Sequence, residues 1–354
     1  MSPVTWLVLS GAVGLTAGLG GAAGMLVRAR RGALPFDLPD TRRLHAAPTP
    51  RGGGIGIVVA GVAALPIAVA LGGPVERRLL TVLVLVWALP NGLIGLIDDH
   101  RALSPRMKLA IQLVAASAAV ALGLRMSNVA VPPLGTLALG PLAMPLCVLW
   151  LVWMANVFNF MDGIDALAAE CGAVFFTCMA GFALLGGAAA VGAPAVAAAA
   201  ALLGFLRYNL PPARIFMGDG GSLFAGALLG GLAIALARDD VAGVPLVASG
   251  LVLGSFGFDA TFTVVRRALR GLALRPHRTH FYQRLALAGW PHHRVRVLYV
   301  ALTAAGGAGA LAILRGSPVM QATALVVVPA SLLVIVGVTR RAERRVARAG
   351  AQRT

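Results

Sequence analysis

Charged residues are scarce in this chain. Only 12% of its 354 residues are charged, and 13 Asp and Glu stand against 30 Lys and Arg. Hydrophobic residues make up 58% of the sequence, more than soluble globular domains contain. A soluble globular fold is therefore excluded, and the lipid bilayer is the first solvent to consider.

Cysteines and phosphate-binding glycine motifs are also few. Cys147, Cys171 and Cys178 fall inside apolar stretches without the spacing of a metal site, so we expect small buried apolar side chains. The P-loop pattern GxxxxGK does not occur, which excludes a P-loop ATPase. No basic segment precedes the first apolar stretch, and three arginines follow it. We therefore expect it to remain as a membrane span rather than be cleaved as a signal peptide.

Long apolar stretches are abundant. A helix needs roughly 20 apolar residues to cross about 30 Å of hydrocarbon, and it satisfies its own backbone groups there. We predict an all-α polytopic membrane protein with 10–11 transmembrane helices, because only Gly186, Gly187 and their neighbours separate two of the candidates. The eleven candidate spans are 4–27, 52–71, 79–97, 107–124, 142–160, 166–184, 186–206, 220–237, 241–265, 296–313 and 318–338.

The basic residues favour one side of the membrane. With the N-terminus outside, most Lys and Arg fall in inner loops. This bias predicts that the N-terminus lies outside and the C-terminus inside. Topology and attraction to anionic membrane lipid account for most of the net charge of +17, so no nucleic-acid partner is needed. A short periplasmic hairpin is expected near 129–141, around Pro132-Pro133.

We expect one integral-membrane domain, 1–338, followed by a basic cytoplasmic tail, 339–354. The acids support an inner-face site, because a carboxylate at membrane depth is costly and rarely accidental. Most acids lie at or near the inner face, within a basic surround that suits a divalent cation and phosphate groups. The inner loops expected to carry the active site are 28–51, 98–108, 156–166, 207–222 and 266–295.

The first candidate motif is the acid pair Asp98-Asp99, at the end of the third span in GLIDDHRALSPRMKLAIQ. Adjacent residues on a helix point about 100° apart, so one acid can face a metal or nucleophile while the other faces elsewhere. Ala102 rules out a DDxxD diphosphate motif. Lys108, the only lysine, follows in the same segment. A solvated charge pair at a helix end is the alternative.

The second motif is NVFNFMDGID, in which Asn156, Asn159, Asp162 and Asp165 recur every three residues. On a helix this spacing places all four on one polar stripe at the mouth of an apolar span. Alternatively, Gly163 breaks the helix and turns Asp165 aside. An ordinary loop with Asn and Asp turn chemistry is a further alternative.

The third motif is RYNLPPARIFMGDGGS, residues 207–222. Its prolines end the incoming helix, and the glycines around Asp219 let backbone N–H groups approach a phosphate or metal. Asp219 is alternatively a simple helix N-cap. Phe216 is placed to stack on a base or to anchor the chain at the membrane interface.

The fourth motif lies in the longest inner loop, in LRPHRTHFYQRL. His277 and His280 flank Arg278, and histidine serves as a phosphate hydrogen-bond donor or as a proton carrier. A solvated basic loop is the alternative. Nearer the N-terminus, the irregular segment 37–56 places Arg51 where it can meet a phosphate.

Five sequence blocks, taken in their order along the chain, resemble the signature of the polyprenyl-phosphate N-acetylhexosamine-1-phosphate transferases (glycosyltransferase family 4). That family includes the lipid I synthase, phospho-MurNAc-pentapeptide transferase, and enzymes that initiate O-antigen and teichoic acid linkage units. HRTHFYQ resembles the branch that initiates surface polysaccharides, which implies a GlcNAc or FucNAc donor. The blocks, between residues 37 and 285, are DLPDTRRLHAAPTPRGGG, GLIDDH, NVFNFMDGID, NLPPARIFMGDGGS and HRTHFYQRL.

The resemblance implies transfer of a sugar 1-phosphate from a UDP-sugar to undecaprenyl phosphate, releasing UMP, with Mg²⁺ required and Mn²⁺ as a substitute. It also implies a bacterial inner (plasma) membrane, with a periplasmic N-terminus and the active site on the cytoplasmic face. Homodimers occur in the family, so a homodimer is possible here. The predicted catalytic residues are Asp98, Asp99, Asp162 and His280, the metal ligands are Asp219 and Asn159, and the substrate-binding residues are Arg51, Lys108, Asn156, Asp165, Phe216, His277 and Arg278.

Two other classes are alternatives. A transporter would suit the many spans, but transport carboxylates usually lie at mid-bilayer, whereas these acids lie at inner helix ends. A CDP-alcohol phosphotransferase would suit Asp162-Gly163, the start of a DGxxAR motif. The motif fails at its Arg, because Leu167 follows Ala166.

Overall fold

The structure, a computed structural model, describes residues 2–32, 36–37, 48–272 and 277–351. Most of the predicted block DLPDTRRLHAAPTPRGGG lies outside these residues. The helical elements are α1 (Pro3–Arg30), α2 (Ile55–Leu71), α3 (Pro74–Thr81), the π-helix η1 (Val82–Ala88), α4 (Leu89–His100), α5 (Pro105–Ala121), the short η2 (Gly140–Leu142), α6 (Ala143–Met161), α7 (Leu167–Leu185), α8 (Ala189–Asn209), α9 (Gly218–Ala237), α10 (Leu246–Val252), α11 (Gly254–Ala268), α12 (Phe281–Leu287), α13 (His292–Arg315), α14 (Pro318–Ser331) and α15 (Leu333–Ala351).

Within the described part, eight helices or continuous helical runs are long and apolar enough to cross a membrane. α10 and α11 meet at an 81° bend and together form a ninth candidate, while α2 is a shorter apolar helix of 17 residues. Every stretch predicted as a span contains helix, including α5, although 241–265 begins with five non-helical residues and is divided between α10 and α11. α7 and α8 are separate helices because the chain turns at Gly187, where φ is +74°. The prediction of an all-α polytopic membrane protein is confirmed.

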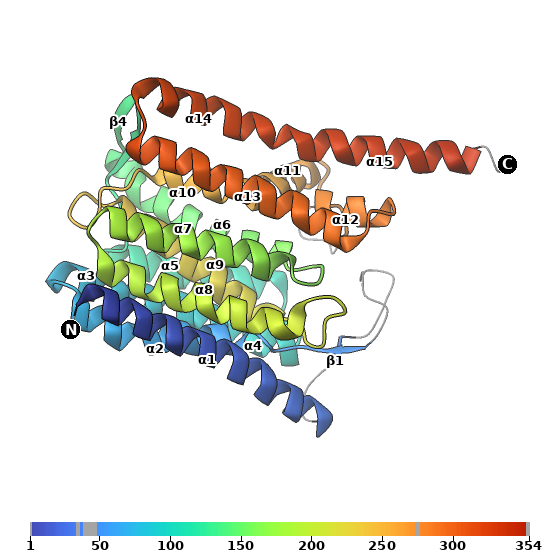
Figure 1. Cartoon of the computed structure of the whole chain (residues 1–354), viewed down its shortest axis with the longest axis horizontal. Coiled ribbons are helices and arrows are strands. Elements are labelled where there is room, and N and C mark those ends of the chain that lie inside the picture. Colours follow the sequence, from blue (N-terminus) through green and yellow to red (C-terminus); the bar gives the residue numbers. More distant parts are fainter. Residues whose placement is uncertain (1, 33–35, 38–47, 273–276, 352–354) are drawn as a thin grey trace.

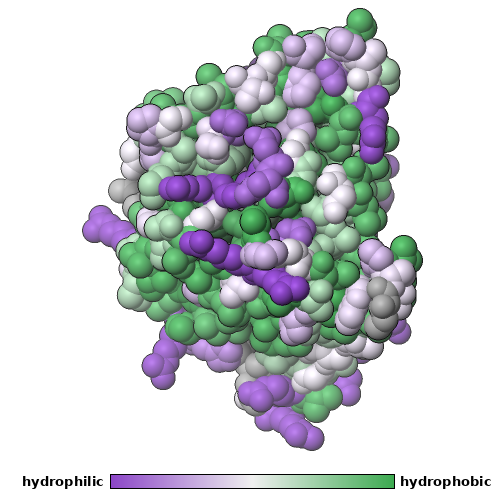
Figure 2. All heavy atoms as spheres, turned by 90° about the vertical axis from the view of Figure 1, so that its left-hand side faces the viewer, coloured by the Kyte–Doolittle hydropathy of each residue, from purple (hydrophilic) through white to green (hydrophobic). Residues whose placement is uncertain are grey.

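Two antiparallel strand pairs lie at opposite ends of the helical bundle. β3 (Asn128–Val131) pairs with β4 (Gly135–Ala138) and confirms the predicted hairpin, whereas β1 (Phe36–Asp37) pairs with β2 (Thr49–Pro50). Figure 1 shows the N-terminus and β4 at one end, and the C-terminus and β1 at the other. We call the first the hairpin end and the second the loop end. Viewed at the hairpin end, hydrophilic residues form separate clusters on a largely hydrophobic surface (Figure 2).

α9 is the central helix of the bundle, and 94% of its span is buried. Small residues on α9 permit this close packing, since a Cβ at Gly226 would lie 2.6 Å from the carbonyl oxygen of Met154 on α6. On α4, a Cβ at Gly95 would lie 2.3 Å from the backbone oxygen of Asp219 on α9. Backbones that approach so closely admit only glycine. The packing therefore brings the loop ends of α4, α6 and α9 together.

Candidate active site

The centre of the candidate site is Lys108, which joins two acids from different helices. Its Nζ donates to Asp98 Oδ2 at 2.9 Å and to Asp219 Oδ2 at 3.2 Å. Lys108 lies in the first turn of α5, whose start is capped by Ser104. Asp98 Oδ1 also accepts from the backbone N–H of Leu103 at 2.6 Å, which holds the α4–α5 turn closed. The lysine is thereby directed back toward both carboxylates.

Asn159 brings α6 into the same cluster. Its Nδ2 donates to Asp219 Oδ1 at 3.1 Å and to Ser222 Oγ at 2.9 Å. Ser222 in turn donates to the carbonyl of Gly218, at the start of α9. Both oxygens of Asp219 are therefore engaged, one by an ammonium and one by an amide. The structure brings together Asp98, Lys108, Asn159 and Asp219, four of the predicted site residues.

Asp99 does not bond to Lys108 or Asn159 but to the backbone at the start of α9. Its side chain is buried, and its two oxygens accept from the backbone N–H groups of Asp219, at 2.9 Å, and Gly220, at 3.1 Å. A carboxylate at a helix N-terminus satisfies free N–H groups and complements the helix dipole. Asp99 is therefore placed to fix the position of Asp219.

The predicted stripe of four polar residues ends early. α6 stops at Met161, so Asp162 and Asp165 lie beyond the helix, as the alternative of a break near Gly163 anticipated. Asp165 Oδ2 accepts from the backbone N–H of Ala213 at 3.0 Å and so holds the loop before α9. Burial raises the pKa of Asp162 to about 7, and the charge of Asp219 acts in the same direction.

Arg51 and Phe216 come from two segments that run side by side. Pro50 O accepts from Phe216 N, and Phe216 O accepts from Gly53 N, each at 2.9 Å. Burial and the charge of Asp219 raise the pKa of Asp162, and the charge of Arg51 partly offsets that rise, so the Arg51 guanidinium lies within electrostatic reach of the acids. Phe216 is partly exposed. This pairing sets a basic and an aromatic residue at the edge of the site.

The histidine motif is organised by Asp259 of α11. None of the predicted motifs includes this acid. Its fully buried carboxylate accepts from His280 Nδ1 at 3.2 Å, from the backbone N–H groups of Phe281 and Tyr282, and from the hydroxyls of two further residues, Thr263 and Tyr299. A charged residue inside an apolar stretch was the available signal.

His280 is buried at the start of α12, and Tyr282 fixes that helix against α6. The Tyr282 hydroxyl donates to the carbonyl of Phe160 at 3.0 Å. The ring of His277 lies 5.0 Å from that of His280, centroid to centroid. Burial lowers the pKa of His277 to about 4, and the charge on His280 acts in the same direction. His277 is therefore neutral at neutral pH, and Arg278 beside it is partly exposed.

Asn156 lies deeper in the bundle than the acids. Its Nδ2 donates to Gln112 Oε1 at 2.8 Å and to the carbonyl of Val152 at 2.7 Å. Both of its amide hydrogens are thus used within the protein. This predicted substrate-binding residue lies on α6, about one helical turn deeper in the bundle than Asn159.

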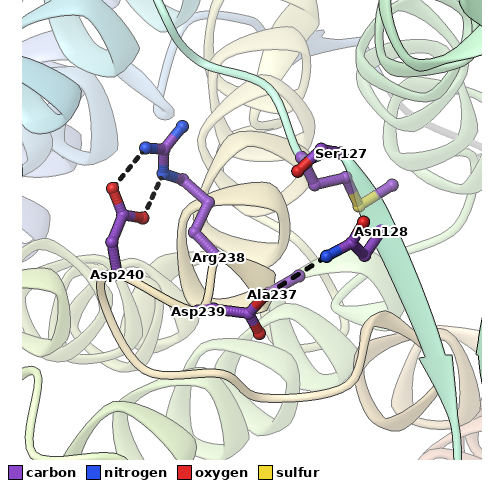
Figure 3. Close-up of a pocket in the computed structure, with 7 residues that line it drawn as sticks. Ser127, Asn128, Ala237, Arg238, Asp239 and Asp240 are labelled. Carbon is purple, nitrogen blue, oxygen red and sulfur yellow. Dashed lines mark hydrogen bonds and ion pairs between the residues drawn. The ribbon is translucent and has the colours of Figure 1, made fainter. Parts of the chain in front are cut away.

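A pocket of about 220 Å³ lies at the hairpin end, far along the bundle from the acids, between β3 and the end of α9. There Arg238 makes a two-point ion pair with Asp240, at 2.8 and 2.6 Å, and Asn128 Nδ2 donates to Asp239 at 3.4 Å (Figure 3). Arg238 also donates to the carbonyls of Gly123 and Arg125. These contacts fix the hairpin to α9, and the pocket contains none of the predicted site residues.

Comparison with known proteins decides the family. The model of "Glycosyl transferase family 4" matches residues 81–237. Over 268 residues the chain is 36% identical to a probable undecaprenyl-phosphate N-acetylglucosaminyl 1-phosphate transferase of Bacillus subtilis, covering 75% of this chain and 73% of the relative. The chain belongs to glycosyl transferase family 4.

Other relatives carry related activities in their names. A decaprenyl-phosphate N-acetylglucosaminephosphotransferase of Mycobacterium tuberculosis is 34% identical over 319 residues, covering 81% of this chain and 78% of the relative. A phospho-N-acetylmuramoyl-pentapeptide-transferase of Moorella thermoacetica is 35% identical over 281 residues, covering 74% and 84%. The family 4 resemblance inferred from the motifs is confirmed, and the chain is a multi-pass membrane transferase.

The region matched by the family 4 model contains the acid–lysine cluster, the NVFNFMDGID motif and Phe216. Arg51 and the histidine motif lie outside it. No three His, Cys, Asp or Glu side chains among the described residues are arranged to bind one ion. Mg²⁺, however, commonly takes one or two carboxylates and completes its shell with water and substrate phosphate. The carboxylate of Asp219, with the amide of Asn159 in contact with it, fits that requirement.

Proposed function

We propose that this family 4 transferase moves a sugar 1-phosphate from a UDP-N-acetylhexosamine to undecaprenyl phosphate, giving undecaprenyl-diphospho-sugar and UMP. The observation that carries the proposal is the Lys108 ammonium held between Asp98 and Asp219. Relatives named for N-acetylglucosamine favour GlcNAc as the sugar, with FucNAc as the alternative. The product would initiate a cell-envelope polysaccharide such as O-antigen.

We place the chain in the bacterial inner membrane with the loop end in the cytoplasm and the N-terminus in the periplasm. In support, the described loops at the loop end are rich in arginine, and the N-terminus and the C-terminus lie at opposite ends (Figure 1). The loop end carries the acid–lysine cluster. A cytoplasmic loop end would give the site direct access to a soluble nucleotide sugar.

The reaction is one in-line displacement. An oxygen of the lipid phosphate attacks the β-phosphorus of the UDP-sugar and forms a new P–O bond. The bond from the β-phosphorus to the bridging oxygen breaks, and UMP leaves with the electron pair. Both reactants are anions, so neutralisation and positioning of charge dominate catalysis.

Most of the predicted site residues have a place in this scheme. Lys108, Arg51 and Arg278 offset phosphate charge, and Asp98 orients the lipid phosphate. His280 and the neutral His277 supply hydrogen bonds to the diphosphate or the leaving UMP. The loop held by Asp165 presents Phe216 to the uracil ring.

Asp219 and Asn159 would hold Mg²⁺, with Asp162 close by, and Mn²⁺ would substitute for it. When bound, the ion would supply positive charge to the diphosphate of the donor. The carboxylate and amide oxygens of this pair are the hard ligands that such an ion prefers.

The test is UMP release by purified protein given undecaprenyl phosphate, Mg²⁺ and a panel of UDP-N-acetylhexosamines. We expect release with UDP-GlcNAc or UDP-FucNAc, loss of release with EDTA, and loss in Asp219→Ala. Asp240→Ala at the hairpin end is the matched control and should retain activity. Folded protein that releases no UMP with any donor, or an active Asp219→Ala variant, would contradict the proposal.

A further inference from the structure

Three amide side chains form a hydrogen-bonded chain inside the bundle. Asn156 Nδ2 donates to Gln112 Oε1 at 2.8 Å, and Gln112 Nε2 donates to Asn91 Oδ1 at 3.1 Å. Asn91 Nδ2 completes the chain by donating to the carbonyl of Trp87 at 2.9 Å. The side chains of Asn91 and Gln112 are only 1% exposed. The chain joins α4, α5 and α6.

Each amide lies close along its helix to a residue of the candidate site. Asn91 precedes Asp98 by seven residues, and Gln112 follows Lys108 by four, spacings that return to the same helix face. Asn156 precedes Asn159 by three. The amide chain therefore lies roughly 5 to 10 Å deeper in the bundle than the acids, on the same three helices.

Two tryptophans extend this connection to α9, which carries Asp219. Trp87 Nε1 donates to the carbonyl of Ala227 at 2.9 Å, and Trp150 Nε1 on α6 donates to the carbonyl of Gly230 at 3.0 Å. All four helices that contribute to the acid–lysine cluster are thus joined by side-chain hydrogen bonds below it.

Such a chain fixes helix register in a way that apolar contacts do not. Apolar side chains tolerate a small slide of one helix along another, whereas an amide in an apolar interior that loses its partner is left unsatisfied. Gln112 is the central member, because its oxygen accepts from α6 while its nitrogen donates to α4. It is also the member nearest in sequence to Lys108, whose long side chain depends on the register of α5.

We propose that Gln112 is a positioning residue for Lys108. By joining α5 to α4 and α6, it holds the ammonium between Asp98 and Asp219. Asn156 acts in the same chain rather than on the substrate. Only the consequence for turnover rests on the proposed function, since the position of the ammonium is a property of the protein alone.

The test uses the fact that Lys108 is the only lysine in the chain. The rate at which an amine-selective reagent modifies Lys108 is measured by mass spectrometry in folded protein, with the N-terminal amine as internal reference. Gln112→Met keeps the side-chain length and removes both hydrogen bonds. We expect Lys108 to react roughly tenfold faster in Gln112→Met, the factor that corresponds to about 1.4 kcal/mol of lost interaction.

Two further variants make the result specific. Asn156→Leu breaks the same chain from α6 and should also raise the Lys108 reaction rate. Gln321→Met is the matched control, because Gln321 lies on α14 and donates to the carbonyl of Ile313 at 3.0 Å, outside the chain. It should leave the rate unchanged. An unchanged rate in both Gln112→Met and Asn156→Leu, or an equal rise in Gln321→Met, would overturn the proposal.

Turnover supplies the second readout. Gln112→Met should lower kcat for UMP release roughly 10- to 100-fold, with little change in the KM of the donor, because a small misplacement of a catalytic group acts on the reacting state. Gln321→Met should keep wild-type kcat, and a wild-type kcat in Gln112→Met would count against the proposal. Wild-type protein that releases no UMP would refute the proposed function, and the reaction rate of Lys108 would still decide the role of Gln112.

Discussion

Lys108 and Asp219 are 111 residues apart in the sequence, yet Nζ of Lys108 lies 3.2 Å from Oδ2 of Asp219. The same Nζ lies 2.9 Å from Asp98 Oδ2. The ammonium therefore occupies the position between two carboxylates where a divalent cation would also be attracted. Lysine and metal ion should compete for this position in the protein without substrate.

Replacing Lys108 tests whether its ammonium and Mg²⁺ compete for the two carboxylates. In Lys108→Ala, we expect Mg²⁺ to raise the melting temperature more than in wild type, because both carboxylates then face the ion alone. UMP release should fall by about 100-fold or more, since a charge-stabilising donor is lost. Lys108→Arg, which keeps the charge, is the control and should show the wild-type response to Mg²⁺. An equal Mg²⁺ response in Lys108→Ala and wild type would contradict this interpretation.

The two adjacent acids should differ in what their loss affects. Asp99→Ala removes two hydrogen bonds to the start of α9 and should lower stability by roughly 1–3 kcal/mol, with or without Mg²⁺. Asp98→Asn should chiefly lower kcat, because Asp98 borders the reacting groups. Thermal unfolding and UMP release on both variants test this division, and it fails if Asp98→Asn is the less stable variant.

The close contact of α4 with α9 is sensitive to one methyl group. A Cβ at Gly95 would lie 2.3 Å from the backbone oxygen of Asp219. Gly95→Ala should push the helices apart, costing roughly 1–3 kcal/mol or more, and lower UMP release as well. Gly24→Ala on α1 is the control, because a Cβ there meets no atom within 4 Å. If Gly95→Ala matches Gly24→Ala in melting temperature and activity, the packing is not as described.

The sequence predicted the helices and the hairpin because apolar length and turn residues are local signals. It also predicted that Asp98, Lys108, Asn159 and Asp219 share a site, since all four lie in inner loops. It did not predict that Asp99 caps α9. The side chains of Asp98 and Asp99 point in different directions from the same helix, and tertiary packing decides which of them faces α9.

The roles of two other residues, Asp259 and Gln112, became visible only in the folded structure. Four of the five donors to Asp259 lie more than twenty residues further along the chain, so its role in holding His280 cannot be seen in the local sequence. Gln112 is one amide in an apolar helix, a signal that is visible in the sequence. Its hydrogen-bond partners on α4 and α6 cannot be read from the sequence, because the register between helices is a property of the folded bundle.

Asp162 should make stability depend on pH. Its pKa is raised to about 7, chiefly by burial, so the folded protein binds this proton more tightly than the unfolded chain. Stability from this group therefore falls as the pH rises from about 4 to about 7 and stays low above that. In EDTA-treated protein, Asp162→Asn should raise the melting temperature at pH 8 and raise it less at pH 5.

Asp240 provides a control of opposite sign. Arg238 lowers the pKa of Asp240, so its carboxylate adds stability above the unfolded pKa, and that stability is lost as the pH falls. Asp240→Asn should not raise the melting temperature at pH 8. A gain in Asp162→Asn that is equal at pH 5 and pH 8 would show that this carboxyl is not responsible.

The central claim is that the transferred group is a sugar 1-phosphate, and the position of an isotope tests it most directly. Purified protein is given undecaprenyl phosphate, Mg²⁺ and UDP-GlcNAc labelled with ³²P at the β-phosphate, with UDP-FucNAc as a second donor and Asp219→Ala alongside. We expect the label to enter the lipid fraction, the released UMP to be unlabelled, and Asp219→Ala to transfer nothing. Two results would contradict it: label recovered in UDP, which would mean transfer of the sugar alone, or a lipid fraction from folded protein that stays unlabelled with both donors.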